Sequence, residues 1–244
     1  MTGHVLITGA SGGLGRAIAR EFADHGAEII TSVDITGPNV VNADLAQPDE
    51  PARVVREAWS RAPVDVLVNC AGIYPSVDMR DVSADQWDRI FALNVRAPVL
   101  TTQALANLAI EAGRAASVVN ISSGSALRSR PGGGPYASSK AALEMATRAA
   151  ALELGGHRIR VNAVSPGFVA VHSDCNPVTP EYAAVMSRNP LGRPGTPADI
   201  ARAVRWVAGA DASWMTGEVV RIDGGSNAGA AHLPRLWPAA EGGR

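Results

Sequence analysis

The amino-acid sequence predicts an α/β fold, a doubly wound, parallel, seven-stranded sheet with helices on both faces. Short apolar runs alternate with longer stretches of helical periodicity along almost the whole chain, which is typical of repeated strand–helix units. The first apolar run passes through a glycine-rich turn directly into a helical pattern. The chain has 244 residues, of which 46% are hydrophobic, enough for the core of one large domain.

Composition excludes several classes of protein. The formal net charge of −1 gives no attraction to nucleic acid or to an anionic membrane. No apolar run approaches the ~18 residues of a membrane-spanning helix. Cys70 and Cys175 are far apart and lack metal-ligand spacing, so we expect neither a disulfide framework nor a metal site. The strand pattern begins at His4, which leaves no room for a signal peptide, so we expect a soluble cytoplasmic protein.

The elements are expected in regular alternation. Apolar runs predict strands at residues 4–8, 28–33, 40–44, 64–68, 116–121, 158–165 and 218–222. Helical periodicity predicts helices at residues 14–25, 51–61, 84–112, 136–154 and 197–208. The alanine-rich helix at 136–154 is apolar on more than one side, which indicates packing against another subunit.

Two segments fall outside this alternation. Residues 172–194 are proline-rich and irregular, which is typical of a lid over a substrate site. Periodicity ends after residue 226. We therefore expect one catalytic domain over residues 1–226 and a tail, residues 227–244, that is disordered or docks on a neighbouring subunit.

The glycine-rich turn after the first strand predicts a phosphate-binding site. Glycines there let backbone N–H groups approach a pyrophosphate, and the N-terminus of the following helix favours its negative charge. Glycine-rich turns are common, but the position between strand and helix makes this one more specific. The residues expected to contact a dinucleotide here are Gly9, Ser11, Gly12, Gly13, Leu14 and Gly15.

Asp34 predicts which dinucleotide binds. It follows the second predicted strand, 19 positions after Gly15. A carboxylate there accepts hydrogen bonds from the 2′-hydroxyl of an adenosine ribose and repels a 2′-phosphate. No basic residue follows at Ile35 or Thr36. The sequence therefore favours NAD over NADP, and the alternative is that Asp34 is a solvated residue at a strand end.

Tyr136 and Lys140 are the strongest candidates for chemistry. They are four residues apart at the start of a predicted helix, so their side chains share one face. Lys140 is the only lysine beside 21 arginines. This indicates a need for a compact ammonium, unless it is chance in an arginine-biased chain. An ammonium nearby lowers the pKa of tyrosine from about 10, so Tyr136 would become a general base.

Two further polar residues are candidates to act with this pair. Ser123 comes just after the strand predicted at 116–121 and 13 residues before Tyr136. The carboxyl end of a strand is where α/β proteins form their sites, so its hydroxyl would hold a substrate oxygen. Asn94 lies inside an apolar helical stretch and must find hydrogen-bond partners. It either ties backbone together or holds a water in a proton relay.

Together these residues resemble the short-chain dehydrogenase/reductase family, in its single-domain Rossmann branch. The resemblance covers residues 3–226. The stretch from Thr8 to Gly15 resembles the family's cofactor turn. The residues that resemble its catalytic tetrad are Asn94, Ser123, Tyr136 and Lys140. Other matching elements are Asp44-Leu45 at the adenine, Asn69-Cys70-Ala71-Gly72, and the Pro166-Gly167 turn beside the nicotinamide.

The resemblance implies an oxidoreductase that passes a hydride between NAD(H) and a secondary alcohol or ketone. Tyr136 would be the general acid or base, and Ser123 would orient the substrate oxygen. Lys140 would lower the tyrosine pKa and bind the nicotinamide ribose, while Asn94 would hold a water linked to Lys140. The implied cofactor contacts outside the glycine turn are Asp34, Ile35, Asp44, Leu45, Asn69, Ala71, Gly72, Tyr136, Lys140, Pro166, Gly167 and Val169. Family members are commonly dimers or tetramers, so a homodimer or homotetramer is expected.

Two positions depart from the family pattern. Val171 stands where a threonine often binds the carboxamide, so backbone groups or Ser173 would have to replace that contact. Cys70 stands in place of a second asparagine. We expect it to be a small packing residue rather than a redox group.

The substrate is weakly encoded. The expected walls are residues 73–80, 125–135 and 172–194, with His172 either lining the pocket or lying in the lid. Arg128 and Arg130 would bind an acidic group or be solvated loop charges, of which the second is commoner. We expect a bulky or cyclic small molecule. Two alternatives stay open: an NADPH-dependent carbonyl reductase, which Asp34 opposes, and a dinucleotide-binding sensor without turnover, which the complete tetrad opposes.

Overall fold

Seven parallel strands form one sheet in the order β3-β2-β1-β4-β5-β6-β7. The structure is a computed structural model that describes residues 3–171, 178–229 and 233. From β1 to β7 the strands span His4–Thr8, Ile29–Asp34, Val41–Asn42, Val66–Asn69, Ala116–Ile121, Ile159–Pro166 and Val219–Ile222. The prediction of a doubly wound Rossmann fold is confirmed.

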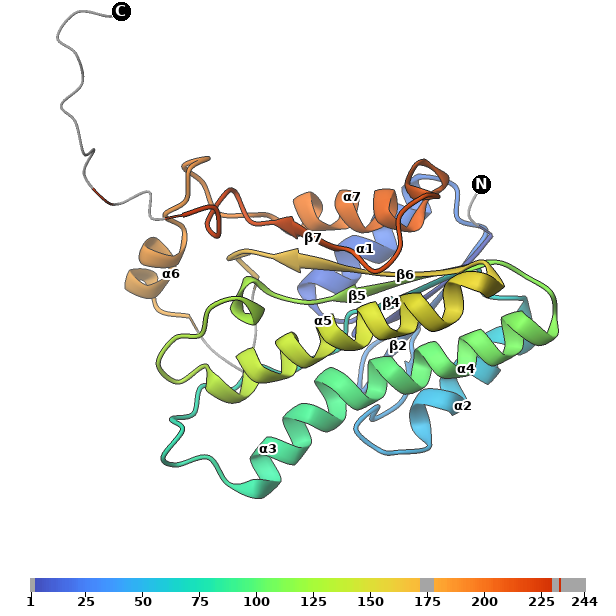
Figure 1. Cartoon of the computed structure of the whole chain (residues 1–244), viewed down its shortest axis with the longest axis horizontal. Coiled ribbons are helices and arrows are strands. Elements are labelled where there is room, and N and C mark those ends of the chain that lie inside the picture. The colour runs from blue at the N-terminus through green and yellow to red at the C-terminus, as the bar shows by residue number, and fades with distance from the viewer. Residues whose placement is uncertain (1–2, 172–177, 230–232, 234–244) are drawn as a thin grey trace, which may run out of the picture.

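Helices cover both faces of this sheet (Figure 1). Helices α1 (Gly13–Asp24) and α7 (Pro197–Ala208) pack together on one face. Helices α2 (Glu50–Arg61), α4 (Ala97–Glu111) and α5 (Gly134–Leu154) lie on the other. The helices of the strand connections between β3 and β6 thus lie on the face opposite to α1 and α7.

A hydrophobic core fills the space on each side of the sheet. In β1, Leu6 belongs to the core beneath α2 and α4, whereas Val5 and Ile7 belong to the core beneath α1 and α7. All three side chains are fully buried. A strand buried on both faces reads as a continuous apolar run, which is why β1 and β5 were predicted with correct bounds.

A π-helical turn, Ala92–Arg96, interrupts the single helix expected at residues 84–112. Helix α3 (Ala84–Phe91) precedes it and α4 follows. The Ala97 N–H donates to the Ala92 carbonyl, five residues back. Pro98 has no N–H, and its ring would clash with the carbonyl four residues earlier in a regular α-helix. The wider π turn avoids this clash, and it sets the position of Asn94.

Helix α6 (Pro180–Met186) lies in the region expected to be irregular, so that prediction was wrong for these residues. The missed signal was Thr179, whose Oγ1 accepts a hydrogen bond from the Tyr182 N–H at 3.2 Å, followed by Pro180 at the first helical position. Residues 172–177, with His172, Ser173 and Cys175, lie outside the described residues, as do 230–232 and 234–244 of the tail.

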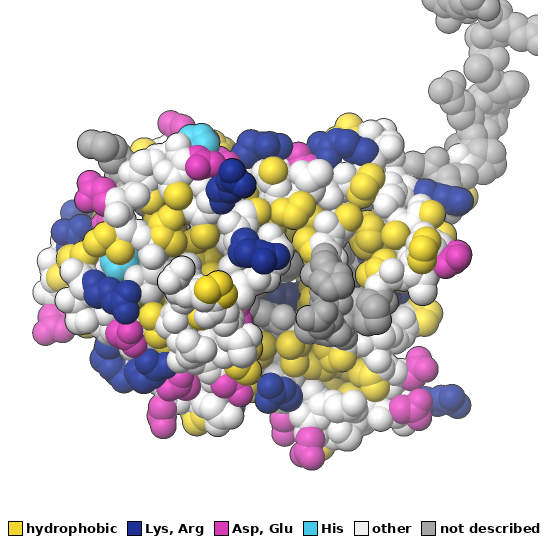
Figure 2. Space-filling view, turned by 180° about the vertical axis from the view of Figure 1, so that it is seen from behind, with side chains coloured by type: hydrophobic (Ala, Val, Ile, Leu, Met, Phe, Trp, Pro, Cys, Tyr) yellow, Lys and Arg dark blue, Asp and Glu magenta, His cyan; other side chains and the backbone are white. Residues whose placement is uncertain are grey.

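The surface mixes charges of both signs. On the face opposite to that of Figure 1, hydrophobic side chains also gather beside a hollow (Figure 2). Among the described helices, none is long and apolar enough to cross a bilayer. The described residues also contain no group of three His, Cys, Asp or Glu side chains arranged to hold a metal ion.

Candidate active site

The predicted cofactor-binding residues gather at one edge of the sheet, where the carboxyl ends of its parallel strands meet. Chain order reverses between β1 and β4, which pair directly, and open α/β sheets bind ligands at such a switch point. These residues are Gly9, Ser11, Gly12, Gly13, Leu14 and Gly15 after β1, Asp34 and Ile35 at β2, Asp44 and Leu45 after β3, Asn69, Ala71 and Gly72 at β4, and Pro166, Gly167 and Val169 at β6.

The turn after β1 has the geometry of an anion cradle. Gly9 has a φ of 68°, and a Cβ added there would lie 2.7 Å from the Ala71 backbone. A Cβ at Gly15 would lie 2.8 Å from the Ala10 Cα, so both positions need glycine. The N-cap residue of helix α1 is Gly12, which has no side chain to accept the first N–H groups, and the first turn contains no acidic residue. Its N-terminal N–H groups can therefore bind a phosphate.

Asp34 lies beside this cradle. Its Oδ2 accepts a hydrogen bond from the Ser11 N–H at 2.8 Å, and its Oδ1 accepts one from the Ile35 N–H at 2.7 Å. These two bonds hold the carboxylate at the turn, where it can meet a ribose hydroxyl. Asp44 Oδ1 accepts from the N–H two residues further on at 3.1 Å, and Leu45 is buried in the core.

Asn69 uses its side chain within the protein. Its Nδ2 donates to Asn120 Oδ1 at 2.9 Å, and its Oδ1 accepts from the Thr101 hydroxyl at 2.8 Å. Asn120 in turn donates to Thr147 at 2.9 Å. This buried network joins β4 and β5 to α4 and α5, so only backbone groups of Asn69 remain for the predicted cofactor contact.

Tyr136, Ser123 and Lys140 come together between the end of β5 and the start of α5. The Lys140 ammonium lies 5.7 Å from the centre of the Tyr136 ring and donates to the Ile121 carbonyl at 2.8 Å. The Ser123 side chain lies close enough to the Tyr136 phenol to favour its ionised form. A Cβ on Gly72 would lie 3.6 Å from Lys140 Nζ, so the ammonium faces the end of β4.

The pKa of Tyr136 differs from the sequence expectation. Burial raises the pKa of Tyr136, and the opposing effects of the Ser123 side chain and the Arg130 charge do not reverse the shift. Burial also lowers the pKa of Lys140 to about 8. The sequence argument made the ammonium the dominant influence on the phenol. In the folded protein, desolvation is the largest influence on the pKa of each of the two groups.

The π turn aims the Asn94 side chain at the segment after β4. Its Oδ1 accepts from the Ile73 N–H at 2.9 Å, and its Nδ2 donates to the Ile73 carbonyl at 2.8 Å. Nδ2 also donates to Ser139 Oγ at 3.0 Å, and Ser139 donates to the Tyr136 carbonyl at 2.7 Å. Of the two expectations for Asn94, these contacts are those of a residue that ties backbone together.

Sequence reasoning missed three buried polar residues near this cluster. Ser139 carries no signal beyond its place next to Lys140. The Ser122 hydroxyl donates to Glu144 Oε1 at 2.8 Å, and Glu144 is only 4% exposed. The available signal was spacing, because Glu144 lies one helical turn beyond Lys140 on the same face.

The two departures from the family pattern are both packing residues. Burial raises the pKa of the Cys70 thiol to about 12, which disfavours the reactive thiolate. Val171 lies against the glycine turn, since a Cβ on Gly13 would be 3.2 Å from its Cγ1. Its side chain offers no hydrogen bond in place of the missing threonine hydroxyl.

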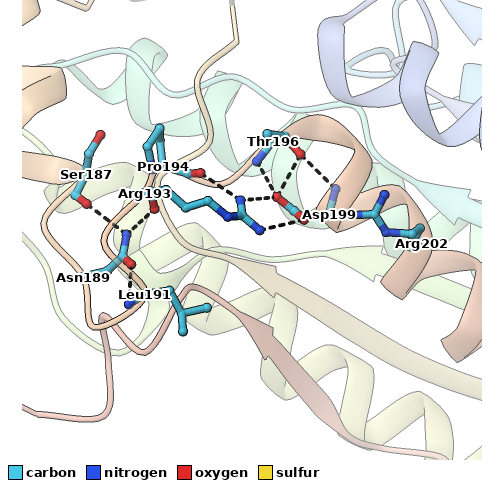
Figure 3. A network of polar contacts seen from close by, with 8 residues as sticks. All are labelled: Ser187, Asn189, Leu191, Arg193, Pro194, Thr196, Asp199 and Arg202. Carbon is cyan, nitrogen blue, oxygen red and sulfur yellow. Dashed lines mark hydrogen bonds and ion pairs between the residues drawn. The ribbon is translucent and has the colours of Figure 1, made fainter.

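The segment after α6 is fixed at its base by polar contacts (Figure 3). Arg193 pairs with Asp199 through two bonds, at 2.7 and 3.1 Å, and this hydrogen-bonded pairing holds the pKa of Asp199 well below its usual range. Thr196 caps α7 by accepting from the Asp199 N–H. Asn189 donates to the Ser187 and Arg193 carbonyls. Residues 187–196 are thus anchored to the start of α7.

Two pairs of aromatic side chains are in contact, and one of them includes Tyr136. The Tyr74 and Tyr136 ring centres are 6.0 Å apart, and those of Phe168 and Tyr182 are 6.3 Å apart. The Val77 N–H donates to the Gly132 carbonyl at 2.9 Å, so the expected walls at 73–80 and 125–135 lie against each other.

The chain is similar to known proteins over most of its length. A family model described as enoyl-(acyl carrier protein) reductase matches residues 9–227. The (3R)-3-hydroxyacyl-CoA dehydrogenase of Mus musculus is 34% identical, over 90% of this chain and 94% of its own.

Two solved structures are also similar. A blue fluorescent protein from a metagenomic library, in complex with NADPH, has a TM-score of 0.82 and 32% identity over 91% of this chain and 97% of its own. A 4-hydroxyisoleucine dehydrogenase complexed with NADH has a TM-score of 0.82 and 27% identity over 93% of this chain and 100% of its own. On the family match and the level of identity, the chain belongs to the short-chain dehydrogenase/reductase family of oxidoreductases.

Proposed function

We propose that this protein is an NAD-dependent dehydrogenase that interconverts a secondary alcohol and a ketone of a small, bulky or cyclic molecule. The observation that carries the proposal is the meeting of Tyr136, Ser123 and Lys140 beside the glycine turn. A phenol near a serine hydroxyl and a buried ammonium, beside a phosphate cradle, suits proton transfer next to a dinucleotide.

In this proposal Tyr136 handles the proton and Ser123 holds the substrate oxygen. On oxidation the O–H bond of the alcohol breaks, its proton passes to the Tyr136 phenolate, and the C=O double bond forms. NAD, when bound beside these residues, would supply the hydride acceptor for the electron pair of the C–H bond that breaks. On reduction, Tyr136 returns the proton to the ketone oxygen.

We assign Lys140 to the nicotinamide ribose and to charge balance at the phenol. With a pKa of about 8, it can exchange a proton at mildly alkaline pH. Asn94 would keep the Ile73 segment against α5 and so position Lys140. The Pro166-Gly167 turn and Val169 would lie beside the nicotinamide.

NAD is the proposed cofactor because of Asp34. Its carboxylate is held at the glycine turn by the Ser11 N–H, where it would accept a ribose hydroxyl and repel a 2′-phosphate. One similar structure holds NADPH and another holds NADH, so similarity favours neither cofactor. The proposal of NAD therefore depends on Asp34. Asp44, Leu45 and the backbone after β4 would line the adenine side.

We also propose a homodimer or homotetramer. Helices α4 and α5 carry exposed apolar side chains, including Met145 at 62% and Leu152 at 86% exposure, and such a face favours a second copy of the chain. Residues 1–226 would form one catalytic domain. Cytoplasmic location is proposed because Cys70 is a free thiol.

Fluorescence titration with NADH and NADPH, followed by turnover on a panel of secondary alcohols, tests the proposal, with Tyr136→Phe as the control. Tighter NADH binding and turnover that needs the Tyr136 hydroxyl are expected. Tighter NADPH binding would indicate the carbonyl reductase instead. Dinucleotide binding without any turnover that depends on Tyr136 would indicate a sensor.

A further inference from the structure

Arg130 lies in the loop before α5, at the edge of the proposed substrate site. Its guanidinium carbon is 4.9 Å from the centre of the Tyr182 ring on α6. Its stem runs along the glycine stretch, because a Cβ on Gly133 would lie 3.0 Å from its Cγ and 3.5 Å from its Nε. The loop itself is fixed, since the Gly132 carbonyl accepts the Val77 N–H.

Within the part of the chain that the structure describes, no oxygen accepts a hydrogen bond from this guanidinium and no carboxylate lies in ion-pair range of it. The arginines around it differ. Arg193 pairs with Asp199, and Arg128 donates to the Ser226 carbonyl at 2.7 Å. A guanidinium has five N–H donors, and the Tyr182 ring covers one of its faces without using them.

This charge lies near the phenol that is proposed to react. It is close enough to Tyr136 to act on the ionisation of its phenol. Tyr182 packs on Phe168, and Tyr74 packs on Tyr136. Arg130 is therefore a half-buried cation that stacks on the Tyr182 ring and lies near the Tyr136 phenol. A partly desolvated cation without a counter-charge favours an anion more strongly than an exposed one does.

We infer that Arg130 binds an anionic group of the substrate, which makes the substrate a hydroxy acid or the corresponding keto acid. The inference rests on the proposed dehydrogenase function and narrows its substrate class. A guanidinium matches a carboxylate through two parallel hydrogen bonds. Bound in this way, the acid would orient the carbinol carbon toward Tyr136, while the aromatic rings contact the carbon chain.

Matched pairs of substrates test this inference. Turnover with NAD is measured for 3-hydroxybutyrate and its methyl ester, and for other hydroxy acids with their esters, in wild type and Arg130→Gln. We expect kcat/KM for the acids to fall by about 10- to 100-fold in the variant, the scale of a lost charged hydrogen bond. The esters should change by less than about 3-fold. Arg128→Gln, two residues away, should leave the preference for acids intact.

A binding measurement tests, without turnover, whether Arg130 binds a carboxylate. Butyrate and butyramide are titrated into the protein–NADH complex, with NADH fluorescence as the readout. Butyrate should bind wild type more tightly than butyramide does, and Arg130→Gln should remove that difference. Arg130→Lys should restore part of it, because the charge returns without the planar fork.

Equal losses for acid and ester in Arg130→Gln would overturn the inference and leave Arg130 as a contact that only holds Tyr182. Wild type that favours esters over acids would also overturn it. Either result, with turnover that still depends on Tyr136, would leave the proposed dehydrogenase function standing. Absence of any turnover that depends on Tyr136, with NADH bound, would instead contradict that function.

Discussion

The side-chain amide of Asn94 spans both backbone polar groups of Ile73, accepting its N–H at 2.9 Å and donating to its carbonyl at 2.8 Å. Asn94 is fully buried and sits in a π turn between α3 and α4. It thus fixes the segment after β4, where Gly72 approaches the Lys140 ammonium. One amide sets the distance between a sheet edge and the proposed proton-transfer group.

Asn94→Ala should lower both stability and turnover. The change leaves the Ile73 N–H and carbonyl without partners in the interior, which costs about 1–3 kcal/mol for each unsatisfied group. Urea unfolding measures the loss of stability. Asn107→Ala is the control, because Asn107 is exposed on α4. Equal unfolding free energies for the two variants would contradict the role given to Asn94.

Lys140→Met should change the pH dependence of stability. Burial lowers the pKa of Lys140 to about 8, whereas a lysine in the unfolded chain has a pKa of about 10.4. Between these two pH values the unfolded chain therefore binds more protons than the folded protein does. The unfolding free energy of wild type should therefore rise with pH across this window, relative to the variant, by about 3 kcal/mol. Arg148→Met, on the exposed side of the same helix, should show no such difference. If the unfolding free energies of wild type and Lys140→Met changed equally with pH, the lowered pKa of Lys140 would be contradicted.

Replacing Asp34 should change cofactor preference. In Asp34→Ser with Ile35→Arg, the carboxylate is lost and a cation is gained for a 2′-phosphate. KM for NAD should rise by about 10- to 100-fold, as expected for a lost charged hydrogen bond, and KM for NADP should fall. Steady-state kinetics with both cofactors measures this, with Asp211→Ser as a surface control. A wild type that already prefers NADP would refute the role of Asp34.

Thr196→Ala should destabilise the start of α7 and the segment attached to it. Thr196 and Asp199 form a capping box in which each side chain accepts the other's backbone N–H. Loss of a threonine cap costs about 1 kcal/mol. Urea unfolding checks the value, and Ser213→Ala, at an exposed position, is the comparison. No difference between the two would mean that the pairing of Arg193 with Asp199 alone holds this helix end.

The bounds of strands and helices were predicted best from the sequence where a strand is buried along its whole length or a helix begins at a clear cap. The bounds of β1, β5 and α7 were correct, because both strands are continuous apolar runs and α7 begins at a threonine cap with proline behind it. The predicted third strand at 40–44 is reduced to Val41–Asn42. It lies at the edge of the sheet and pairs only with β2, so no second neighbour extends it.

The contacts of the site were harder to predict than its members. Spacing brought Tyr136, Ser123 and Lys140 to attention, but their pKa shifts depend on desolvation, which appears only once the core is packed. The π turn at Asn94 depends on Pro98, four residues further on, which lacks the N–H of a regular helix. Asn69 was expected at the cofactor, whereas its side chain is used by Thr101 and Asn120. Such pairings join elements far apart in the chain and leave no local pattern.

The central claim is that Tyr136 ionises to serve as the proton acceptor when NAD is bound. Tyrosinate absorbance of wild type minus Tyr136→Phe, followed up to about pH 10 with and without NAD, isolates this one phenol. Burial raises its pKa in the protein alone, so no tyrosinate signal should appear there. With NAD, whose nicotinamide ring is positively charged, the signal should appear below pH ~10 because that charge favours the phenolate. An unchanged difference spectrum on adding saturating NAD would contradict the account.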